Sequence, residues 1–476
     1  MLSRTIEQTA LTKLIWVVIA LVCALFIGSV GAKMQLPVLA VIIIFFVTLS
    51  ISFVRGTDGL YILIFAMLFS PEISSGITAS SKAGEGSSIV VRLDDIIMFA
   101  VVLGWILKSA YQGQHIAIIK TRVTPAIWIY MAVSIIATLL GMLAGSIQHP
   151  MSAIFHNLKY FEYFLLFFMI LAHVRSKETI SKMIGAMFIV FFLVCIYGYY
   201  QISQGIRVSA PFDKEPNTLG GYTVLLMCMA AGIALCDNRA RVRAPLVLLL
   251  IFAIPPLLFS LSRASYLAFI VGILAFLFIS SHRILISAIA IVLATSMMLG
   301  LPVLPEKVQK RVAKTFQQER EYHVQIAGID FDASASARLV SYQKALKLWI
   351  QKPLLGYGVT GSHFIDGQYV RILIETGILG LAAFLAIFWR LLLAVKKIYK
   401  ETHDSLLKGI AMGLFCGIIA LLAHAISANT FIIIRINEPF WLLAGLVLLI
   451  PKLETEPREF LSTGNGPNTY DIIQGT

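Results

Sequence analysis

The sequence predicts an all-α membrane protein, a polytopic bundle of transmembrane helices. The chain of 476 residues is 58% hydrophobic and only 13% charged, and its mean hydropathy is +0.86. Soluble domains do not have this composition. Apolar runs close to the ~20 residues that cross a bilayer recur along the chain. Short loops rich in Lys and Arg alternate with these runs, as in multi-pass membrane proteins.

About fourteen apolar runs are candidate spans, of which the third and the last are short. The first, from Leu14 to Val30, has no small-residue cleavage site before a soluble domain, so we expect a retained span and not a signal peptide. The runs cover roughly residues 14–31, 36–54, 59–70, 93–109, 124–143, 156–172, 179–200, 218–236, 244–260, 262–280, 284–300, 370–394, 407–428 and 437–450.

The basic loops predict the orientation of the chain. They fall on one side of the predicted spans, and the short loops on the other side carry far fewer Lys and Arg. This asymmetry predicts that the basic loops and both termini are cytoplasmic. The net charge of +13 is then explained by orientation in the membrane, and nucleic acid is rejected as a partner. The basic loops are "KSAYQGQHIAIIKTR", "HVRSKETISK", "DNRARVRAP" and "KKIYKETHDSLLK".

This topology divides the chain into four regions. Residues 1–300 hold spans one to eleven, 301–369 form a large loop on the outer side, 370–451 hold spans twelve to fourteen, and 452–476 form a polar, disordered cytoplasmic tail. The loop has helical patterning, and its second helix should rest an apolar stripe on the membrane surface before "KPLLGYG" ends it. That stripe consists of Leu339, Tyr342, Leu346 and Trp349.

Six charged residues from four segments converge on the predicted outer face. Arg207 lies in "IRVSAPFDKEPN", Arg263 in "SLSRASYLA" and Arg338 at the start of the loop helix, whereas "FIDGQYVRILIETG" opens the twelfth span. Arginine binds phosphate oxygens bidentately, and a carboxylate within hydrogen-bonding reach of a hydroxyl can take its proton. The pattern therefore suits glycosyl transfer from a lipid-diphosphate donor. The twelfth span contributes Asp366, Arg371 and Glu375.

Simpler interpretations of the same residues remain open. Each arginine could be a membrane anchor, Arg371 and Glu375 are four apart and could pair with each other, and Asp366 could be the N-cap of the twelfth span. Lys159 and Glu162 could line a groove or anchor their helix at the interface. No metal site is predicted, because the outer histidines and the scattered cysteines lack ligand spacing. These are His149, His156, His323, His363, Cys23, Cys195, Cys228, Cys236 and Cys416.

Four of these segments, in this order, resemble the bacterial O-antigen ligase and O-antigen polymerase superfamily. The resemblance covers roughly residues 200–450 and rests on "IRVSAPFDKEPNTLGGY", "SLSRASYLAFIVG", "ARLVSYQKALKLWIQKPLLGYG" and "DGQYVRILIETGILG". It implies a GT-C-like bundle in the bacterial inner membrane, an active face in the periplasm and no cofactor. It also implies as partners membrane lipid, undecaprenyl-diphosphate-linked oligosaccharide, and other polysaccharide-assembly proteins such as a flippase and a chain-length regulator.

The last segment departs from the family pattern at one place. The usual His-Asn pair is replaced by Asp366 and Gly367, and the histidine is thought to be the catalytic base of the ligases. The resemblance therefore implies Asp366 as the acid/base group or an acceptor-sugar ligand, with Glu375 orienting the site. It implies Arg207, Arg263 and Arg338 as diphosphate ligands, and Arg371 and Tyr369 as further substrate contacts. The positions that keep the pattern are Tyr369, Leu373, Glu375, Gly377 and Gly380.

Two further expectations follow. Gly377 and Gly380, three apart, should let a neighbouring helix approach closely.

The function favoured is polymerisation of undecaprenyl-diphosphate-linked repeat units, with a ligase that transfers the glycan to lipid A-core or another acceptor as the alternative. A flippase or transporter is the second alternative. Transporters often have repeated halves and helices broken near the midplane, whereas this sequence has no repeat and its charges gather at one face.

Overall fold

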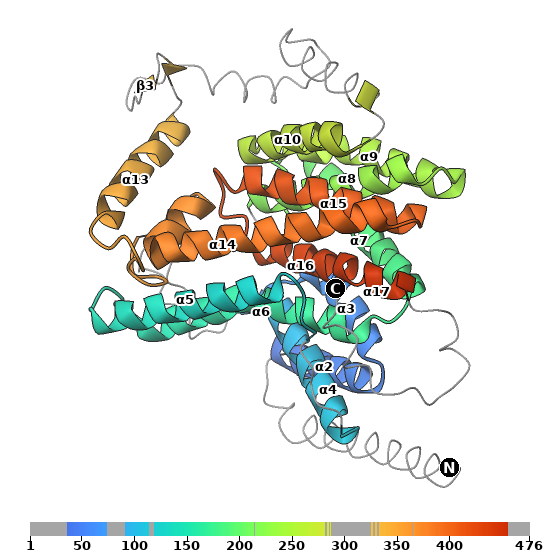
Figure 1. Ribbon diagram of the computed structural model, residues 1–476, viewed down its shortest axis with the longest axis horizontal. Coiled ribbons are helices and arrows are strands. Elements are labelled where there is room, and N and C mark those ends of the chain that lie inside the picture. Colours follow the sequence, from blue (N-terminus) through green and yellow to red (C-terminus); the bar gives the residue numbers. More distant parts are fainter. Residues whose placement is uncertain are drawn as a thin grey trace.

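The structure is a computed structural model that describes residues 36–73, 91–113, 119–213, 215–280, 333–363 and 365–455, with short pieces at 283–284, 286, 325–326 and 329–330. This part of the chain is a bundle of helices, most of which run along one direction (Figure 1). Two antiparallel strand pairs accompany them, β1 (Glu72–Ile73) with β2 (Val91–Arg92) and β3 (Gln325–Ile326) with β4 (Ile329–Asp330).

Twelve of the fourteen predicted spans coincide with helices, while 14–31 and nearly all of 284–300 lie outside the described residues. Eight helices are long and apolar enough to cross a membrane, and α3, α10 and the described part of α2 are apolar but shorter. The multi-pass helical class is confirmed, and the count of fourteen stays a prediction. The helices are α2 (Leu36–Val54), α3 (Gly56–Phe69), α4 (Leu93–Tyr111), α5 (Thr124–Leu143), α6 (Pro150–His173), α7 (Lys177–Ser203), α8 (Pro216–Cys236), α9 (Ala240–Phe259), α10 (Arg263–Ile279), α13 (Ala333–Trp349), α14 (Gln368–Glu401), α15 (Ser405–His424), α16 (Ile434–Leu448) and α17 (Ile450–Thr455).

The helices α8, α15 and α16 form the centre of the bundle. Their most apolar stretches are 72–83% buried, whereas that of α9 is only 22% buried and faces outward. The centre packs closely because small residues meet there: a Cβ on Gly232 of α8 would overlap the backbone of Gly413 on α15. Close helix contacts through small residues are typical of membrane bundles, where apolar burial alone does not favour one helix neighbour over lipid.

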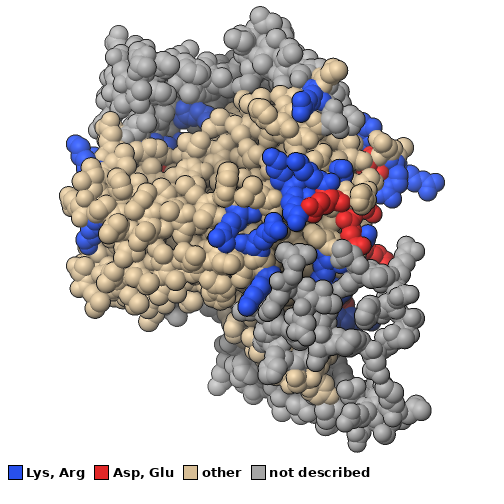
Figure 2. Space-filling model, in the orientation of Figure 1, with Lys and Arg blue, Asp and Glu red and all other residues tan. Residues whose placement is uncertain are grey.

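The two ends of the bundle differ in charge. The described turn residues 70–73, 91–92, 144–149, 204–213, 260–262 and 425–433 lie at one end with α13, and we call this the α13 end. The opposite turns, near 112–113, 119–123, 174–176, 237–239 and 402–404, belong to the predicted basic loops. Figure 2 shows Lys and Arg gathered at that opposite end, with a broad band of uncharged surface between the ends.

The long helix α14 is broken close to its start. Gly377 has φ 67° and ψ −167°, and the segment 353–358 bonds to the opened backbone. Gly358 N–H donates to Glu375 O at 2.8 Å, and Ile378 N–H donates to Pro353 O at 2.9 Å. A Cβ on Gly377 would overlap Leu354. The expectation that a helix approaches Gly377 and Gly380 is therefore wrong: Gly377 admits the "PLLGYG" segment, and a Cβ on Gly380 would meet Thr376 of its own helix.

The loop helix α13 lies beside the first turns of α14 (Figure 1). Its buried contact is Ala345, which packs with Ile365 and Ile374 and is flanked by Tyr342 and Trp349. Leu346 is exposed, so the predicted stripe is displaced by about one residue on the helix surface. The structure describes the backbone of Leu339 but not its side chain. The segment "PEKVQKRVAKTFQQEREYH" lies outside the described residues.

Candidate functional site

Asp366 lies opposite Arg338 at the α13 end. The Arg338 Nε to Asp366 Oδ2 distance is 3.4 Å, and the side chains are 29% and 46% exposed. This partner comes from α13, which the residue spacing around Asp366 did not predict. Tyr342, one turn further along α13, holds the helix in place because its hydroxyl donates to Ile426 O at 2.9 Å. A Cβ on Gly367 would overlap the Tyr342 ring, so the glycine after Asp366 lets α13 pack here.

Asp366 does not cap α14. The helix begins at Gln368, its N-cap is Gly367, and no side chain makes the capping bond. The start of the helix is instead held by Gln368, whose backbone N–H donates to Ala425 O and whose Oε1 accepts from Phe431 N–H. The Asp366 carboxylate is thus free of a capping role and keeps a half-exposed position.

Arg207 fastens the 204–215 segment to the turn between α9 and α10. Its Nε donates to Ser260 O at 2.7 Å and its Nη2 donates to Leu261 O at 3.0 Å. Arg263 is the first residue of α10, two positions after Leu261. The structure therefore brings Arg207 and Arg263 to the same turn, although they belong to different loops.

Glu215 connects this turn to Asp366. Its pKa is raised above the ordinary value by burial first, and then by the negative charges of Asp213 and Asp366, while Arg207 and Arg338 oppose the shift. All four neighbours thus lie within electrostatic range of one carboxyl group at the N-terminus of α8. Glu215 was not among the residues predicted from the sequence, although the acidic pair in "FDKEPN" beside a predicted site arginine was an available signal.

Arg371 and Glu375 form a second, buried group. Arg371 Nε lies 3.0 Å from Glu375 Oε1, and the two side chains are 11% and 7% exposed. Arg371 Nη2 also donates to the Tyr160 hydroxyl at 3.0 Å. The interpretation that these residues pair at i,i+4 is confirmed. The Tyr369 hydroxyl donates to Leu422 O at 2.7 Å, and this hydrogen bond connects α14 to α15.

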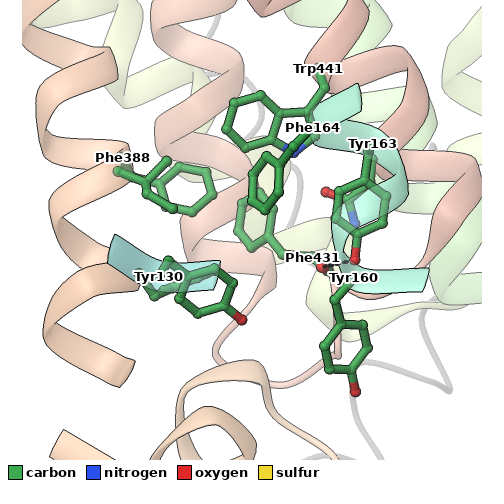
Figure 3. A pocket seen from close by; sticks show the side chains of 10 residues that line it. Tyr130, Tyr160, Tyr163, Phe164, Phe388, Phe431 and Trp441 are labelled. Carbon is green, nitrogen blue, oxygen red and sulfur yellow. Dashed lines mark hydrogen bonds between the residues drawn. The ribbon is translucent and has the colours of Figure 1, made fainter. Parts of the chain in front are cut away.

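An aromatic pocket adjoins this buried group, and Tyr160 belongs to both. Rings from α5, α6, α14, α16 and the 425–433 segment lie side by side in Figure 3. Tyr163 donates its hydroxyl to Phe431 O at 3.3 Å. The polar groups of the pocket are the phenol hydroxyls, the Asn437 amide and the Trp441 indole N–H, and its other lining side chains are phenyl or aliphatic. Its lining residues are Tyr130, Tyr160, Tyr163, Phe164, Phe384, Ile387, Phe388, Phe431, Asn437 and Trp441.

A further group of buried charges was not singled out in the sequence. Arg435 on α16 is fully buried, donates through Nη2 to Ser70 O at 2.7 Å, and places Nη1 3.2 Å from Asp213 Oδ2. Its contact with Asp213 holds in place the segment that carries Arg207 and Glu215. The signal was the charged sequence "RINE" inside an apolar run. On α6, Lys159 pairs with Asp95 and Glu162, so it is an internal partner and not only an interface anchor.

A comparison with protein families gives one match. Residues 245–385 match the family model described as O-antigen ligase. The matched region contains Arg263, Arg338, Asp366, Arg371 and Glu375, and the match confirms the resemblance to the O-antigen ligase and polymerase superfamily. Among curated proteins, none matches the chain.

Proposed function

We propose that this chain, which carries the O-antigen ligase family region at residues 245–385, polymerises lipid-linked oligosaccharide repeat units. The enzyme would be a glycosyltransferase of the bacterial inner membrane, with undecaprenyl-diphosphate-linked oligosaccharide as donor and a second lipid-linked unit as acceptor. The observation that carries this proposal is the contact of Arg338 with Asp366 at one end of an apolar bundle, with Arg207 and Glu215 within electrostatic range.

The arginines would bind the donor diphosphate. Arg207, Arg263 and Arg338 come from three separate segments of the α13 end, and guanidinium groups keep their charge while they hold phosphate oxygens in pairs. A diphosphate on a lipid lies at the depth where helices end, so the α13 end suits the headgroup and the apolar band suits the chain.

Asp366 would accept the proton of the attacking hydroxyl. The acceptor oxygen forms a bond to the anomeric carbon of the donor, and the bond from that carbon to the diphosphate oxygen breaks. The bonding pair leaves with undecaprenyl diphosphate, and the hydroxyl proton moves to the Asp366 carboxylate. The 3.4 Å contact with Arg338 is longer than the ~2.7–2.9 Å typical of a charge-assisted hydrogen bond. Substrate could therefore separate the two side chains at low cost.

Glu375 would act by holding Arg371. Both side chains are nearly buried and bonded to each other, which suits positioning better than proton transfer to a solvent-exposed sugar. Arg371 and Tyr369 would then shape the floor of the site next to the aromatic pocket. Glu375 was expected to be catalytic, and we now propose that its role is to orient Arg371.

The proposed topology places the α13 end in the periplasm and the basic end in the cytoplasm, with both termini cytoplasmic. Residues 301–369 would be the periplasmic cap, between spans within 1–300 and 370–451, and 452–476 the cytoplasmic tail. A flippase would supply the lipid-linked unit, and a chain-length regulator would be a further partner, since polymerisation consumes what a flippase delivers.

Purified protein in proteoliposomes with a defined undecaprenyl-diphosphate-linked oligosaccharide tests the proposal. We expect a ladder of longer lipid-linked glycans on a gel, with undecaprenyl diphosphate released in step. A protein with Arg338→Ala and Asp366→Asn together is the matched inactive control. If the wild-type protein produces no product above one repeat unit while inserted and folded, polymerisation is excluded.

The same preparation separates the alternatives. Transfer to added lipid A-core without elongation would indicate the ligase, a function favoured by the description of the matched family. Movement of the labelled lipid across the bilayer without new glycosidic bonds would indicate the flippase. The break in α14 is a feature shared with transporters, but it lies near the helix start and is filled by the 353–358 segment.

A further inference from the structure

A chain of hydrogen-bonding side chains crosses the α13 end. It joins Thr430, His424 at the end of α15, Ser265 and Ser262 at the start of α10, and Asn217 in the first turn of α8. The successive distances are 2.7 Å from Thr430 Oγ1 to His424 Nδ1, 3.2 Å from His424 Nε2 to Ser265 Oγ, and 2.7 Å for both remaining contacts. The first four residues are at most 1% exposed, whereas Asn217 is partly exposed.

The hydrogen atoms along this chain run in one direction. If His424 Nδ1 carried the hydrogen, Thr430 would accept it, and no acceptor in the described part of the chain would remain for the Thr430 hydroxyl. Thr430 therefore donates to Nδ1, and neutral His424 donates through Nε2–H to Ser265. Ser265 then donates to Ser262, and Ser262 donates to Asn217 Oδ1.

This direction fixes the Asn217 amide. The Ser262 oxygen already accepts the Ser265 hydroxyl and the Ser265 backbone N–H, so its own hydrogen needs an acceptor. Only the Oδ1 side of the amide supplies one, because the Nδ2 side carries hydrogens. The amide oxygen therefore faces inward to Ser262, and the NH₂ group faces the other way.

Through Ser262, Asn217 is joined to the turn of the α13 end that Arg207 and Arg263 share. Ser262 directly precedes Arg263 and follows Leu261, whose carbonyl accepts from Arg207. Glu215, two residues before Asn217, lies within electrostatic range of Arg207 and Arg338. Among the described residues, Asn217 Nδ2 meets no protein acceptor. A directed pair of N–H donors is thus presented where the diphosphate is proposed to bind.

We infer that Asn217 is a substrate-binding residue, which donates Nδ2–H to an oxygen of the donor diphosphate. The buried chain from Thr430 holds the amide in the orientation that this contact needs. The inference rests on the proposed function for the identity of the ligand. An amide adds direction to a group of arginines that supply charge, and loss of a hydrogen bond to a charged group weakens binding by about 10- to 100-fold.

Equilibrium binding of radiolabelled undecaprenyl diphosphate to purified protein in nanodiscs tests this inference. We expect Asn217→Ala to weaken binding about 10- to 100-fold. Asn217→Asp keeps an acceptor for Ser262 but replaces the donor by a negatively charged oxygen, so it should bind at least as weakly. Ser262→Ala removes the contact that orients the amide, together with the bonds that Ser262 accepts from Ser265 at the N-cap of α10. It leaves the amide donor itself, so among folded protein it should weaken binding less than Asn217→Ala.

Asn157 provides a matched control. It accepts from Ser134 Oγ through Oδ1 at the same 2.7 Å, but its Nδ2 is used internally, on Thr138 Oγ1 and Ala153 O. Asn157→Ala should therefore leave lipid-diphosphate binding by the folded fraction unchanged. Equal weakening by Asn217→Ala and Ser262→Ala would mean that only their mutual bond matters, and would overturn the inference, as would wild-type binding in Asn217→Ala.

Elongation measured on the same samples keeps the two proposals distinguishable. If Asn217→Ala loses binding while the wild-type protein binds but does not elongate, the inference stands and polymerisation falls. If the wild-type protein elongates and Asn217→Ala binds normally, polymerisation stands and the inference falls. If the wild-type protein does not bind the lipid diphosphate, both are overturned.

Discussion

Asp366 is the residue on which the proposed chemistry depends most directly. Asp366→Asn keeps the size of the side chain but cannot accept a proton, so we expect elongation to fall by about 10²–10⁴-fold. Lipid-diphosphate binding should change little, because the arginines remain. Gel ladders and binding on the same purified variant measure the two effects. Elongation at the wild-type rate would rule out Asp366 as the base. A capping role could not take its place, because α14 begins at Gln368 and no side chain caps it.

Glu215 is the competing carboxylate, and pH separates it from Asp366. Burial and two neighbouring negative charges raise the pKa of Glu215. A base must be ionised to work, so a raised pKa moves the loss of activity at acidic pH upward, above the ordinary range of a glutamate. We expect Glu215→Gln to keep elongation and the acidic limb of the pH–rate profile. Loss of that limb in Glu215→Gln, with Asp366→Asn still active, would transfer the role of base to Glu215.

The buried pair of Arg371 and Glu375 is expected to matter for stability first. Glu375→Gln removes the carboxylate that faces the Arg371 guanidinium, which is 11% exposed, and breaking a buried pair costs about 3–5 kcal/mol. We expect a lower Tm in detergent for Glu375→Gln and for Arg371→Met. The double variant Arg371→Met with Glu375→Leu should recover part of the loss. A double variant less stable than either single one would contradict this account.

At the residue scale, the sequence could predict a pair within one helix but not pairs between distant segments. Spacing along one helix was enough to suggest the Arg371–Glu375 pair, because i,i+4 neighbours meet on any helix. It could not reveal that Arg338 lies opposite Asp366 or that Arg435 braces Asp213. Those contacts join segments that are distant in sequence, and one sequence alone contains no distance information between loops.

At the scale of elements, the break in α14 favours glycine over any other residue at position 377. Its φ of 67° is unfavourable for other residues, and a Cβ would overlap Leu354. Such backbone strain costs about 1–3 kcal/mol before any displacement of the 353–358 segment. We expect Gly377→Ala to lower Tm. We also expect it to lower elongation, because the first turn of α14 carries Arg371 and closely follows Asp366, so a shift of the helix start would displace both side chains.

Gly185→Ala is the matched control for that substitution. Gly185 lies within α7, and a Cβ there meets nothing within 4 Å. Alanine is favoured over glycine inside a helix by about 1 kcal/mol, so Tm should stay the same or rise. Equal behaviour of the two variants would show that the break in α14 does not hold the site.

Because of this break, the sequence predicted α14 only in part. Continuous apolarity after Gly377 indicated a span, and the helix is there. The pattern of "ETGILG" contains no sign that "PLLGYG" exchanges backbone hydrogen bonds with it, since those bonds involve groups that every residue shares. Helices were therefore predictable from composition and periodicity, whereas irregular backbone within the bundle was not.

At the scale of the whole molecule, charge and apolarity decide the orientation. The predicted basic loops do lie together, opposite α13, which independent loops of random orientation would not produce. The helices α2–α10 and α14–α16 follow one another in the order of the predicted spans, and the run 284–300 between them lies almost wholly outside the described residues. The division of buried from outward-facing helices, such as α8 from α9, was not predictable because both contain a long, strongly apolar stretch.

The last prediction concerns sidedness. Because basic loops stay in the cytoplasm, an alkaline phosphatase fused at Gln325 should be exported and active, whereas the same enzyme fused at Thr402 should be inactive. A cytoplasmic reporter such as β-galactosidase should give the reverse pattern at the two sites. Every proposed substrate contact lies at the α13 end, so the donor must reach that face. Phosphatase activity at Thr402 with none at Gln325 would put the site in the cytoplasm, and with it a donor that had not yet crossed the membrane.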